Sequence, residues 1–200
     1  PHMAKHRFQI DQLIINSLYT QGYFLAANLE PSGYSNHTLK SRKAILFAGA
    51  FFESEWFESW LHQFAAEVEQ QILGDGGHNE RSPMYHLLAL EDVLDCVALL
   101  SAMKYAIPES IHTRLPGMLS FAGGLCHTDG SIACFNDAAE GIALSPQYLF
   151  DFAIQFGYDI HEKWAFPDTG YYILRDATTD SRMIIDCGVL GPRHNPGHAH

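Results

Sequence analysis

Positive charge is scarce in this chain. Its 200 residues include 12 lysines and arginines against 23 aspartates and glutamates, which gives a formal net charge of −11. Nonspecific binding to nucleic acid depends on a basic protein surface, so this balance argues against a nucleic-acid partner. It also argues mildly against an anionic substrate, although a local basic cleft can exist within an acidic protein.

Long hydrophobic runs are missing as well. The longest run, at 44–52, has nine residues, whereas a helix that crosses a membrane needs roughly 20. We therefore expect no membrane span. Apolar residues are nevertheless plentiful, at 47% of the chain with 13 phenylalanines. This composition is typical of a globular protein that buries the core of one domain or a little more.

The four cysteines lack the C-x-x-C spacing of common metal and redox motifs. They are Cys96, Cys126, Cys134 and Cys187. The plainest interpretation is that they are small buried hydrophobic residues, and one disulfide is the main alternative. Their pattern does not identify the cellular compartment.

Helical patterns fill the first three quarters of the chain. Ser82-Pro83 is a strong helix start, because serine caps the helix and proline suits its first position. Gly74 is a natural helix stop. The predicted helices are 7–29, 36–52 with Asn36 as its cap, 56–73, 83–105, a short helix bounded by Pro108 and Pro116-Gly117, and 146–156.

The pattern changes to strands after Trp164. The runs 171–175 and 182–186 are strand-like, and the polar residues between them predict a hairpin. Helices followed by strands indicate two consecutive domains. We place a helical segment at 4–160 and the start of a sheet domain at 161–200, and we interpret residues 1–3 as a cloning remnant.

The last seven residues carry three histidines, His194, His198 and His200. If this end is extended, His198 and His200 point to one face, since side chains alternate along a strand. Such a pair can supply a metal ligand or a proton-transfer group. Zinc needs three or four ligands, so the remaining ones would lie beyond residue 200. We therefore expect a piece of a larger protein, cut inside its active site.

Several motifs together resemble one family. They are Asn36-His37, the block from Asp75 to His86 (Gly-Gly-His-Asn-Glu-Arg-Ser-Pro-Met-Tyr-His at its centre), Asp129-Gly130-Ser131-Ile132, Phe135-Asn136-Asp137-Ala138, Asp168-Thr169-Gly170-Tyr171-Tyr172 and the tail with Pro-Gly-His-Ala-His. In this order they resemble the heparinase II/III-like polysaccharide lyases over nearly the whole chain. The resemblance implies a mainly α fold, an incomplete (α/α) toroid of antiparallel helices followed by the first strands of an antiparallel β-sandwich domain.

The resemblance also implies a reaction, β-elimination on uronic-acid polysaccharides, and roles for named residues. Asn36 with His37 would neutralise the uronate carboxylate, Tyr85 would act as acid or as both base and acid, and His198 would be the second proton-transfer group. His200 would be the first ligand of a structural zinc. Substrate contacts are expected from Lys40, His78, Glu80, Arg81 and His86.

Two details of this assignment follow from physical chemistry. Tyr85 could serve as a base at neutral pH only if nearby positive charge lowered its pKa from about 10, and Arg81, His86 or His37 could supply that charge. Many relatives carry an acidic residue where this chain has Lys40, one helical turn after His37. A cation there could hold a substrate carboxylate, or it could mark altered or lost activity.

Two rival functions remain open. A toroidal glycoside hydrolase would need two carboxylates across a cleft, with Glu80, Asp129 and Asp137 as candidates. A non-catalytic polysaccharide-binding or surface-polysaccharide assembly protein could use aromatic residues as sugar platforms. The aromatic candidates are Trp56, Trp60, Trp164, Tyr171 and Tyr172. We expect an anionic uronate polysaccharide as partner, a periplasmic or secreted location, and little or no activity from these 200 residues alone.

Overall fold

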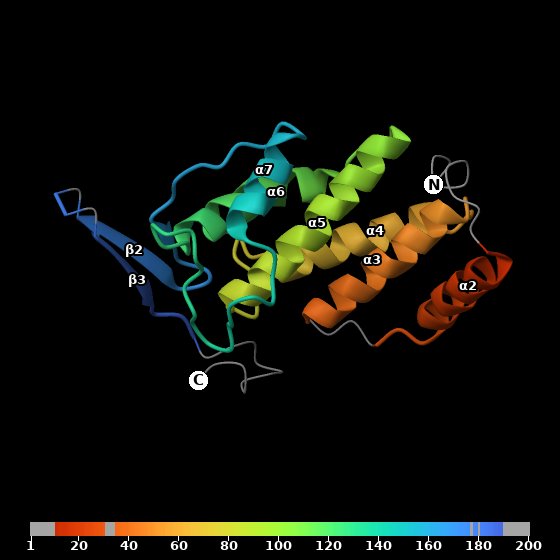
Figure 1. Cartoon of the computed structure of the whole chain (residues 1–200), viewed down its shortest axis with the longest axis horizontal. Helices are drawn as coiled ribbons and strands as arrows, with labels where there is room; N and C mark the ends of the chain where they lie inside the picture. Colours follow the sequence, from red (N-terminus) through yellow and green to blue (C-terminus); the bar gives the residue numbers. More distant parts are fainter. Residues whose placement is uncertain (1–10, 31–34, 177, 180, 190–200) are drawn as a thin grey trace. The chain divides into compact units, whose positions relative to one another are not determined.

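The computed structural model describes residues 11–30, 35–176, 178–179 and 181–189. Six helices and a three-stranded antiparallel sheet lie within these residues, in the order predicted, with the helices first (Figure 1). The chain divides into two compact units, Pro1–Glu67 and Val68–His200. Each unit is described by itself below. In the described part of the chain, no helix is long and apolar enough to cross a membrane.

The first unit contains α2 (Gln12–Ala27), α3 (Asn36–Phe51) and most of α4 (Phe57–Gln71). Asp11 caps α2, since its carboxylate accepts a hydrogen bond of 2.7 Å from the backbone N–H of Leu13. Helices α2 and α3 lie against each other at Gly22, where an added Cβ would be 3.1 Å from the Cβ of Ala48. The small side chains at this crossing allow the two backbones to approach closely.

The start of α3 differs from the prediction by one residue. Ser35 occupies the capping position and Asn36 is the first helical residue, so Asn36 is not the cap. Helix α4 ends at Gln71, two residues before the predicted end. There the chain turns back on itself, because the carbonyl of Gln71 accepts a hydrogen bond of 2.8 Å from the backbone of Asn79.

The second unit is built on α5 (Pro83–Met103), α6 (Glu109–Gly124) and α7 (Pro146–Ile154). The predicted start of α5 is confirmed, with Ser82 as its cap and Pro83 in the first turn. The prediction that Pro116-Gly117 ends a short helix is wrong, because α6 continues through Pro116. Gly117 packs against the backbone of Gly76 at this point. This packing holds the helix in place beyond the proline, where the Ser120 hydroxyl also donates to the Pro116 carbonyl at 2.9 Å.

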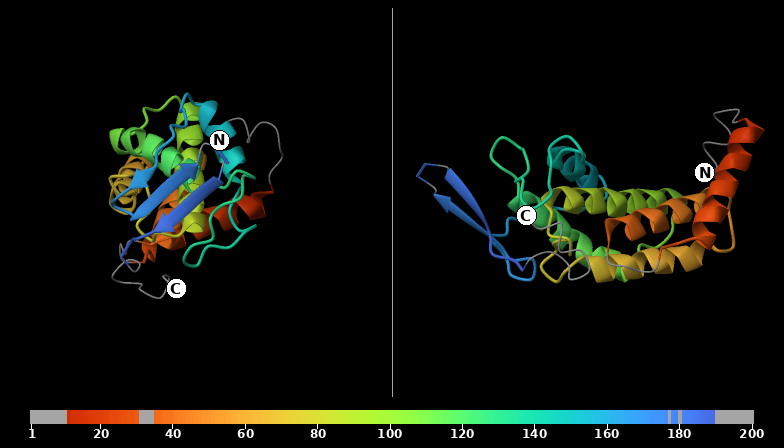
Figure 2. Two further views of the ribbon diagram at one scale, coloured as in Figure 1. Left: turned by 90° about the vertical axis from the view of Figure 1, so that its left-hand side faces the viewer. Right: turned by 90° about the horizontal axis from the view of Figure 1, so that it is seen from below.

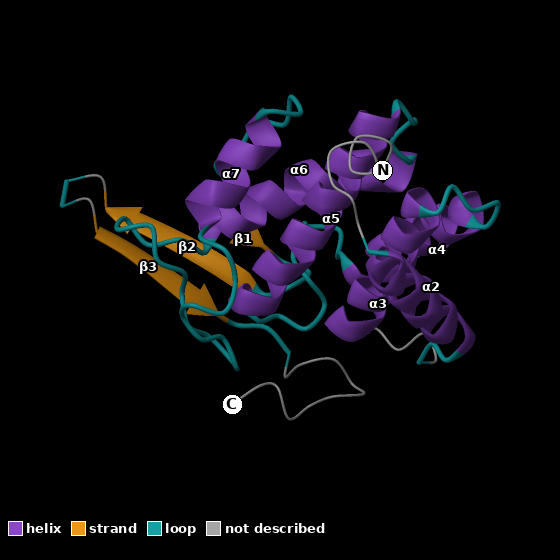
Figure 3. Ribbon diagram, turned by 45° about the vertical axis from the view of Figure 1, so that its right-hand side comes forward, coloured by secondary structure: helices purple, strands orange, loops and turns teal. Residues whose placement is uncertain are grey.

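The sheet contains β1 (Ala165–Phe166), β2 (Tyr171–Asp176) and β3 (Ser181–Asp186), side by side in that order. Strands β2 and β3 form the predicted hairpin (Figure 3). In this hairpin Ile173 pairs with Ile184. The alternation of side chains along β2 buries Tyr171 and Ile173 and exposes Tyr172 and Leu174. One face of the hairpin therefore belongs to the core of this unit.

A cluster of aromatic and aliphatic side chains joins α6 to this sheet. It consists of Phe121, Leu125, Phe166, Tyr171 and Ile173, all buried. The ring of Phe121 meets Phe166 and Tyr171 edge to face, with centroids 5.0 and 5.7 Å apart, an arrangement that aromatic pairs favour. The hairpin extends beyond the helices from this anchored end (Figure 2). The anchor fixes Tyr171 and its neighbours beside the residues that precede α5.

Candidate active site

The first turn of α3 carries Asn36 and His37. Asn36 is half-buried, whereas His37 and Lys40, one turn later, are exposed. All three therefore keep accessible surface, as a contact with a polysaccharide requires. Their predicted roles concern a bound substrate and stay predictions.

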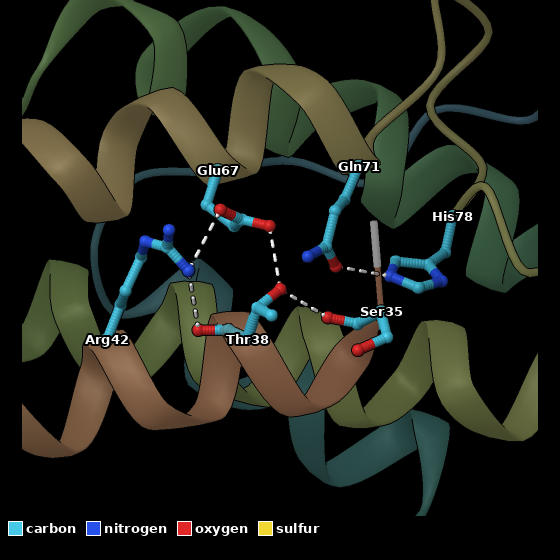
Figure 4. A network of polar contacts seen from close by, with 6 residues as sticks. All are labelled: Ser35, Thr38, Arg42, Glu67, Gln71 and His78. Carbon is cyan, nitrogen blue, oxygen red and sulfur yellow. Dashed lines mark hydrogen bonds and ion pairs between the residues drawn. The ribbon is translucent and has the colours of Figure 1, made fainter. Parts of the chain in front are cut away.

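A buried polar network supports this turn (Figure 4). The hydroxyl of Thr38 lies 2.7 Å from the Ser35 carbonyl and 2.7 Å from Glu67 Oε1, so its proton is shared between two acceptors. Arg42 Nη1 forms an ion pair of 3.0 Å with Glu67 Oε2 and donates to the Thr38 carbonyl at 3.3 Å. The helix turn that carries Asn36 and His37 is thus tied to α4.

Thr38, Arg42 and Glu67 are not among the residues predicted from the sequence. Thr38 and Arg42 are four residues apart and therefore share one face of α3 with the buried residues Leu39, Ile45 and Leu46 nearby. Polar residues at helical spacing within an apolar face indicate a buried network. This signal was present in the sequence, but it does not identify Glu67 as the partner.

The loop between α4 and α5 is held by Asp75. Its Oδ1 accepts a hydrogen bond of 3.0 Å from the Gly77 N–H, and its Oδ2 accepts two from Thr169, at 2.7 Å from the backbone and 2.8 Å from the hydroxyl. Lys163 donates to the Asp75 carbonyl at 3.2 Å. These contacts fasten the loop to the segment that leads into β2.

His78 is fully buried inside this loop. Its Nε2 lies 2.8 Å from Gln71 Oε1, and its Nδ1 accepts a hydrogen bond of 3.3 Å from the Glu80 N–H. These partners require the proton on Nε2. Burial, with a smaller contribution from His86, lowers the pKa of His78 to about 3, so the ring is neutral at pH 7.

His86 is also buried, on the first turns of α5. Its Nε2 donates to the Met118 carbonyl at 2.9 Å, and its ring packs against Phe121 with centroids 4.6 Å apart. Burial lowers the pKa of His86 to about 4, against smaller raising effects of the Met118 carbonyl and Asp75. His86 therefore links α5 to α6 as a neutral ring.

Three of the predicted substrate residues are buried. His78, Glu80 and His86 have 0%, 2% and 1% of their surface exposed, and their predicted contacts with a polysaccharide stay predictions. Tyr171 is likewise 0% exposed and offers no platform for a sugar ring. Trp164 and Tyr172 keep 38% exposed each. The geometry gives the buried residues a structural role.

Arg81 stands at the entry to α5 in a left-handed backbone conformation, with φ at 57°. Its Nε donates to the Thr169 carbonyl at 3.1 Å, and its Nη2 donates to the Asp168 carbonyl at 3.4 Å. The Arg81 carbonyl accepts a hydrogen bond of 2.7 Å from the Tyr171 hydroxyl. The Arg81 guanidinium is thus hydrogen-bonded to backbone carbonyls of the segment that precedes β2.

Tyr85 is a half-buried residue on the first turn of α5, where its N–H donates to Ser82 Oγ at 3.5 Å. Burial raises the pKa of its phenol, and so do the negative charges of Asp137 and Glu80 and a hydrogen bond to Asp137. A tyrosine base would need its pKa lowered by Arg81, His86 or His37, whereas the pKa of Tyr85 is raised. Tyr85 is therefore protonated at neutral pH and suited to donate a proton.

The turn at 135–138 lies beside the start of α5. The side-chain amide of Asn136 donates to the Arg81 carbonyl at 2.8 Å, and it lies 3.2 Å from the Tyr171 hydroxyl and 3.4 Å from Asp186 Oδ2. Asn136 and Asp137 belong to one of the sequence motifs, but no local pattern connects them with Tyr85. Only the folded chain brings these segments together.

The terminal histidines lie outside the described residues. His198 and His200, and with them the zinc site, therefore stay predictions. Within the described part of the chain, no group of three or more His, Cys, Asp and Glu side chains is placed to hold a metal ion.

Comparison with known proteins gives several relatives. Among curated proteins, a heparin-sulfate lyase from Bacteroides stercoris is 30% identical over 116 residues, which cover 54% of this chain and 17% of that protein. A heparin-sulfate lyase from Pedobacter heparinus is 29% identical over 82 residues, which cover 38% of this chain and 12% of that protein. The chain therefore matches less than a fifth of the length of these relatives.

Solved structures show the same fold. A crystal structure of heparinase III superposes with a TM-score of 0.68 at 20% identity over 84% of this chain and 31% of that one. Heparan sulfate lyase HepC from Pedobacter heparinus gives a TM-score of 0.65 at 18% identity over 94% of this chain and 32% of that one. The helices followed by a sheet thus form part of a larger known architecture.

Two family models account for almost the whole sequence. The model of the heparinase II/III N-terminus matches residues 6–164, and that of the heparinase II/III-like C-terminal region matches residues 160–200. The motifs quoted from the sequence, the order of helices and strands, and these matches agree. The chain belongs to the heparinase II/III family.

Proposed function

We propose that this chain carries part of the active site of a polysaccharide lyase that cleaves uronic-acid polysaccharides by β-elimination. The observation that carries the proposal is the environment of Tyr85, a partly accessible phenol kept protonated by burial and two carboxylates. Family membership supports the reaction class. The curated relatives are heparin-sulfate lyases, so heparan-type glycosaminoglycans are the first substrates to test.

The reaction removes the C5 proton of the uronate and expels the O4 oxygen of the neighbouring sugar. The C5–H electrons form the C4–C5 double bond while the C4–O4 bond breaks. The C5 proton is barely acidic, because its removal adds negative charge next to the carboxylate. Hydrogen-bond donors on that carboxylate stabilise the developing charge. Asn36 and His37, on the accessible first turn of α3, are our candidates for this role.

Tyr85 is our candidate for the acid that protonates the departing O4. A phenol whose pKa is raised holds its proton at neutral pH and transfers it to the much more basic leaving oxygen. The same property disfavours Tyr85 as the base. We assign the base to a histidine, with His198 as first candidate and His37 as the alternative.

The remaining predicted residues fall into two groups. Lys40 is exposed on α3 and suits contact with an anionic chain. Arg81 orders the backbone at 168–169, while His78, Glu80 and His86 support the loop and the start of α5 from inside. We further propose that His200 is a ligand of a structural zinc in the intact protein. Zinc would there stabilise the fold around His198.

The test uses the intact protein on a panel of uronate polysaccharides, including heparan sulfate and alginate. Elimination yields a 4,5-unsaturated uronate, and its ultraviolet absorbance measures the reaction. We expect a rise with at least one polymer, and its loss in Asn36→Ala and Tyr85→Phe. The 200 residues of this chain should by themselves give little or no product.

Two other outcomes would support the rival functions. New reducing ends without the unsaturated product would indicate a hydrolase, with Glu80, Asp129 and Asp137 as carboxylates to test. Binding of a polymer without any change in its length would indicate a binding or assembly protein. Either result would overturn the proposed elimination.

A further inference from the structure

The proposed reaction does not use Asp137, although this residue contacts the proposed acid. Asp137 lies on the turn at 135–138, more than fifty residues after Tyr85 in the sequence. Its side chain is hydrogen-bonded to the Tyr85 phenol. This hydrogen bond raises the pKa of the phenol, so the Tyr85 hydroxyl is the donor and a carboxylate oxygen of Asp137 accepts.

Asn136 holds this turn against α5. Its side-chain amide donates to the Arg81 carbonyl at 2.8 Å, four residues before Tyr85. The Tyr171 hydroxyl donates to the same carbonyl at 2.7 Å. Asn136 also has a left-handed backbone, with φ at 56°, a conformation that asparagine tolerates better than most residues. The contact between Asp137 and Tyr85 is therefore built into the fold.

The hairpin contributes to the same anchor. Tyr171 is buried in the cluster with Phe121, and Asp186 Oδ2 lies 3.4 Å from the Asn136 amide. Strands β2 and β3 pair Tyr171 with Asp186. The sheet thus holds the side chain of Asn136 in place. Asn136 in turn positions Asp137, the next residue along the chain.

We propose that Asp137 is a positioning residue for Tyr85: its carboxylate accepts the phenolic hydrogen bond and directs the hydroxyl group, while Asn136 keeps the turn in place. This deepens the function proposed above and rests on it for its catalytic meaning. The contact itself is independent of the reaction and is testable without a substrate.

The charge of Asp137 has a second effect. A phenolate beside a carboxylate is repelled, so Asp137 opposes ionisation of Tyr85. Glu80, before α5, acts in the same direction. His86 follows Tyr85 on the helix but is neutral, with a pKa of about 4. Asp137 therefore favours the protonated phenol that an acid requires.

The first experiment measures Tyr85 in the protein without substrate. Tyrosines are labelled with carbon-13 at Cζ, and the Tyr85 signal is assigned by its loss in Tyr85→Phe. We follow its titration from the ordinary tyrosine pKa of about 10 upward, because the pKa of Tyr85 is raised, in the wild type and in Asp137→Asn. The asparagine variant keeps the size of the side chain and removes its charge. We expect the midpoint to fall by about one pH unit.

Asp129→Asn is the matched control. Asp129 is an exposed aspartate on another turn, where it accepts hydrogen bonds from Ser131. Its replacement should leave the Tyr85 midpoint unchanged. Asp137→Ser serves as a second variant in case Asp137→Asn does not fold, as judged by circular dichroism. An unchanged Tyr85 midpoint in a folded Asp137 variant would overturn the proposal.

The second experiment measures turnover in the intact protein. If Tyr85 donates its proton, kcat falls as pH rises through the Tyr85 pKa. Asp137→Asn should move this alkaline limb to lower pH and reduce kcat about tenfold or more, with a smaller change in KM. A fall in kcat without movement of the limb would indicate a structural role and contradict the proposal.

The two experiments separate the two proposals. If no polymer is cleaved while the Tyr85 midpoint moves in Asp137→Asn, the lyase function fails and the contact stands. If elimination is observed but neither the midpoint nor the alkaline limb moves, the role of Asp137 fails and the lyase function stands.

Discussion

Asp75 and Thr169 are joined by two hydrogen bonds although 94 residues separate them in the sequence. Asp75 Oδ2 accepts the Thr169 backbone N–H at 2.7 Å and its hydroxyl at 2.8 Å. One residue follows a helix and the other precedes a strand. This pair therefore connects the helical and the sheet parts of the second unit.

Asp75→Asn should destabilise the protein by about 1–3 kcal/mol, because an amide cannot accept all three hydrogen bonds and leaves a buried donor without its acceptor. The midpoint of urea unfolding measures this loss. Asp129→Asn is the control, since Asp129 accepts equivalent local bonds from Ser131 on an exposed turn. The control should change stability by less than about 0.5 kcal/mol. Equal losses of stability in the two variants would show that the hydrogen bonds of Asp75 to Gly77 and Thr169 do not stabilise the fold more than local bonds on an exposed turn.

The buried pair of Arg42 and Glu67 yields a second prediction. Replacing one partner, as in Glu67→Gln, leaves the other charge buried, and we expect a loss of about 3–5 kcal/mol. The double variant Arg42→Met with Glu67→Leu should lose less than either single variant, because no buried charge remains. Chemical denaturation of Arg42→Met, of Glu67→Leu and of the double variant measures this coupling.

An exposed pair provides the comparison. Arg175 and Glu162 are 3.9 Å apart with side chains 47% and 74% exposed. Arg175→Met should cost less than about 1 kcal/mol. The prediction fails if the double variant at 42 and 67 is as unstable as the sum of its single variants.

The buried histidines predict a loss of stability in acid. The pKa values of His78 and His86 are about 3 and 4 in the folded chain, against about 6.5 when unfolded. The unfolded chain therefore binds more protons between these values, and the free energy of unfolding falls as pH drops below about 6.5. Each histidine contributes to the slope of the free energy of unfolding against pH, and this contribution approaches about 1.4 kcal/mol per pH unit.

His86→Gln isolates one of these contributions. The glutamine amide can still donate to the Met118 carbonyl, but it does not titrate. Between about pH 6.5 and pH 5, where most carboxylates stay ionised, the variant should show a flatter dependence of stability on pH. His127→Gln, at an exposed position, should keep the wild-type slope. A slope that is the same in all three proteins would contradict this account.

Gly76 is a position where a side chain has no room. Its φ is 99°, and an added Cβ would overlap the backbone of Gly117 on α6. Gly76→Ala should therefore cost clearly more than the strain of a left-handed alanine, which is about 1–2 kcal/mol. Gly141→Ala measures that strain alone, since Gly141 has a φ of 75° and nothing within 4 Å of an added Cβ. Thermal unfolding of the two variants gives the difference, and equal midpoints would contradict the close approach.

Local signals explain what the sequence predicted correctly. Ser82-Pro83 starts α5 because a capping hydroxyl and a proline act on their own backbone and need no distant partner. The β2–β3 hairpin was predicted for a similar reason, since its strands are neighbours in the sequence. The helices-then-strands order and the family resemblance both follow from such ordered motifs.

Distant contacts explain what the sequence did not reveal. Pro116 is a helix breaker by its own chemistry, yet α6 continues because Gly117 packs on Gly76. His78 and His86 were predicted from a motif, but only the fold shows that both are buried and that burial keeps their rings neutral at pH 7. No local pattern shows which histidine is buried.

The sequence by itself determined the family, the helical and strand segments and the motif that holds Tyr85, because capping, periodicity and short motifs act over a few residues. Only the tertiary structure decided how Tyr85 behaves. The pKa of a phenol depends on burial and on the charges within a few ångströms, and here these charges come from Glu80 nearby and from Asp137 on a distant turn. The fold places that turn through Asn136 and Arg81, and it thereby keeps the Tyr85 phenol protonated at neutral pH.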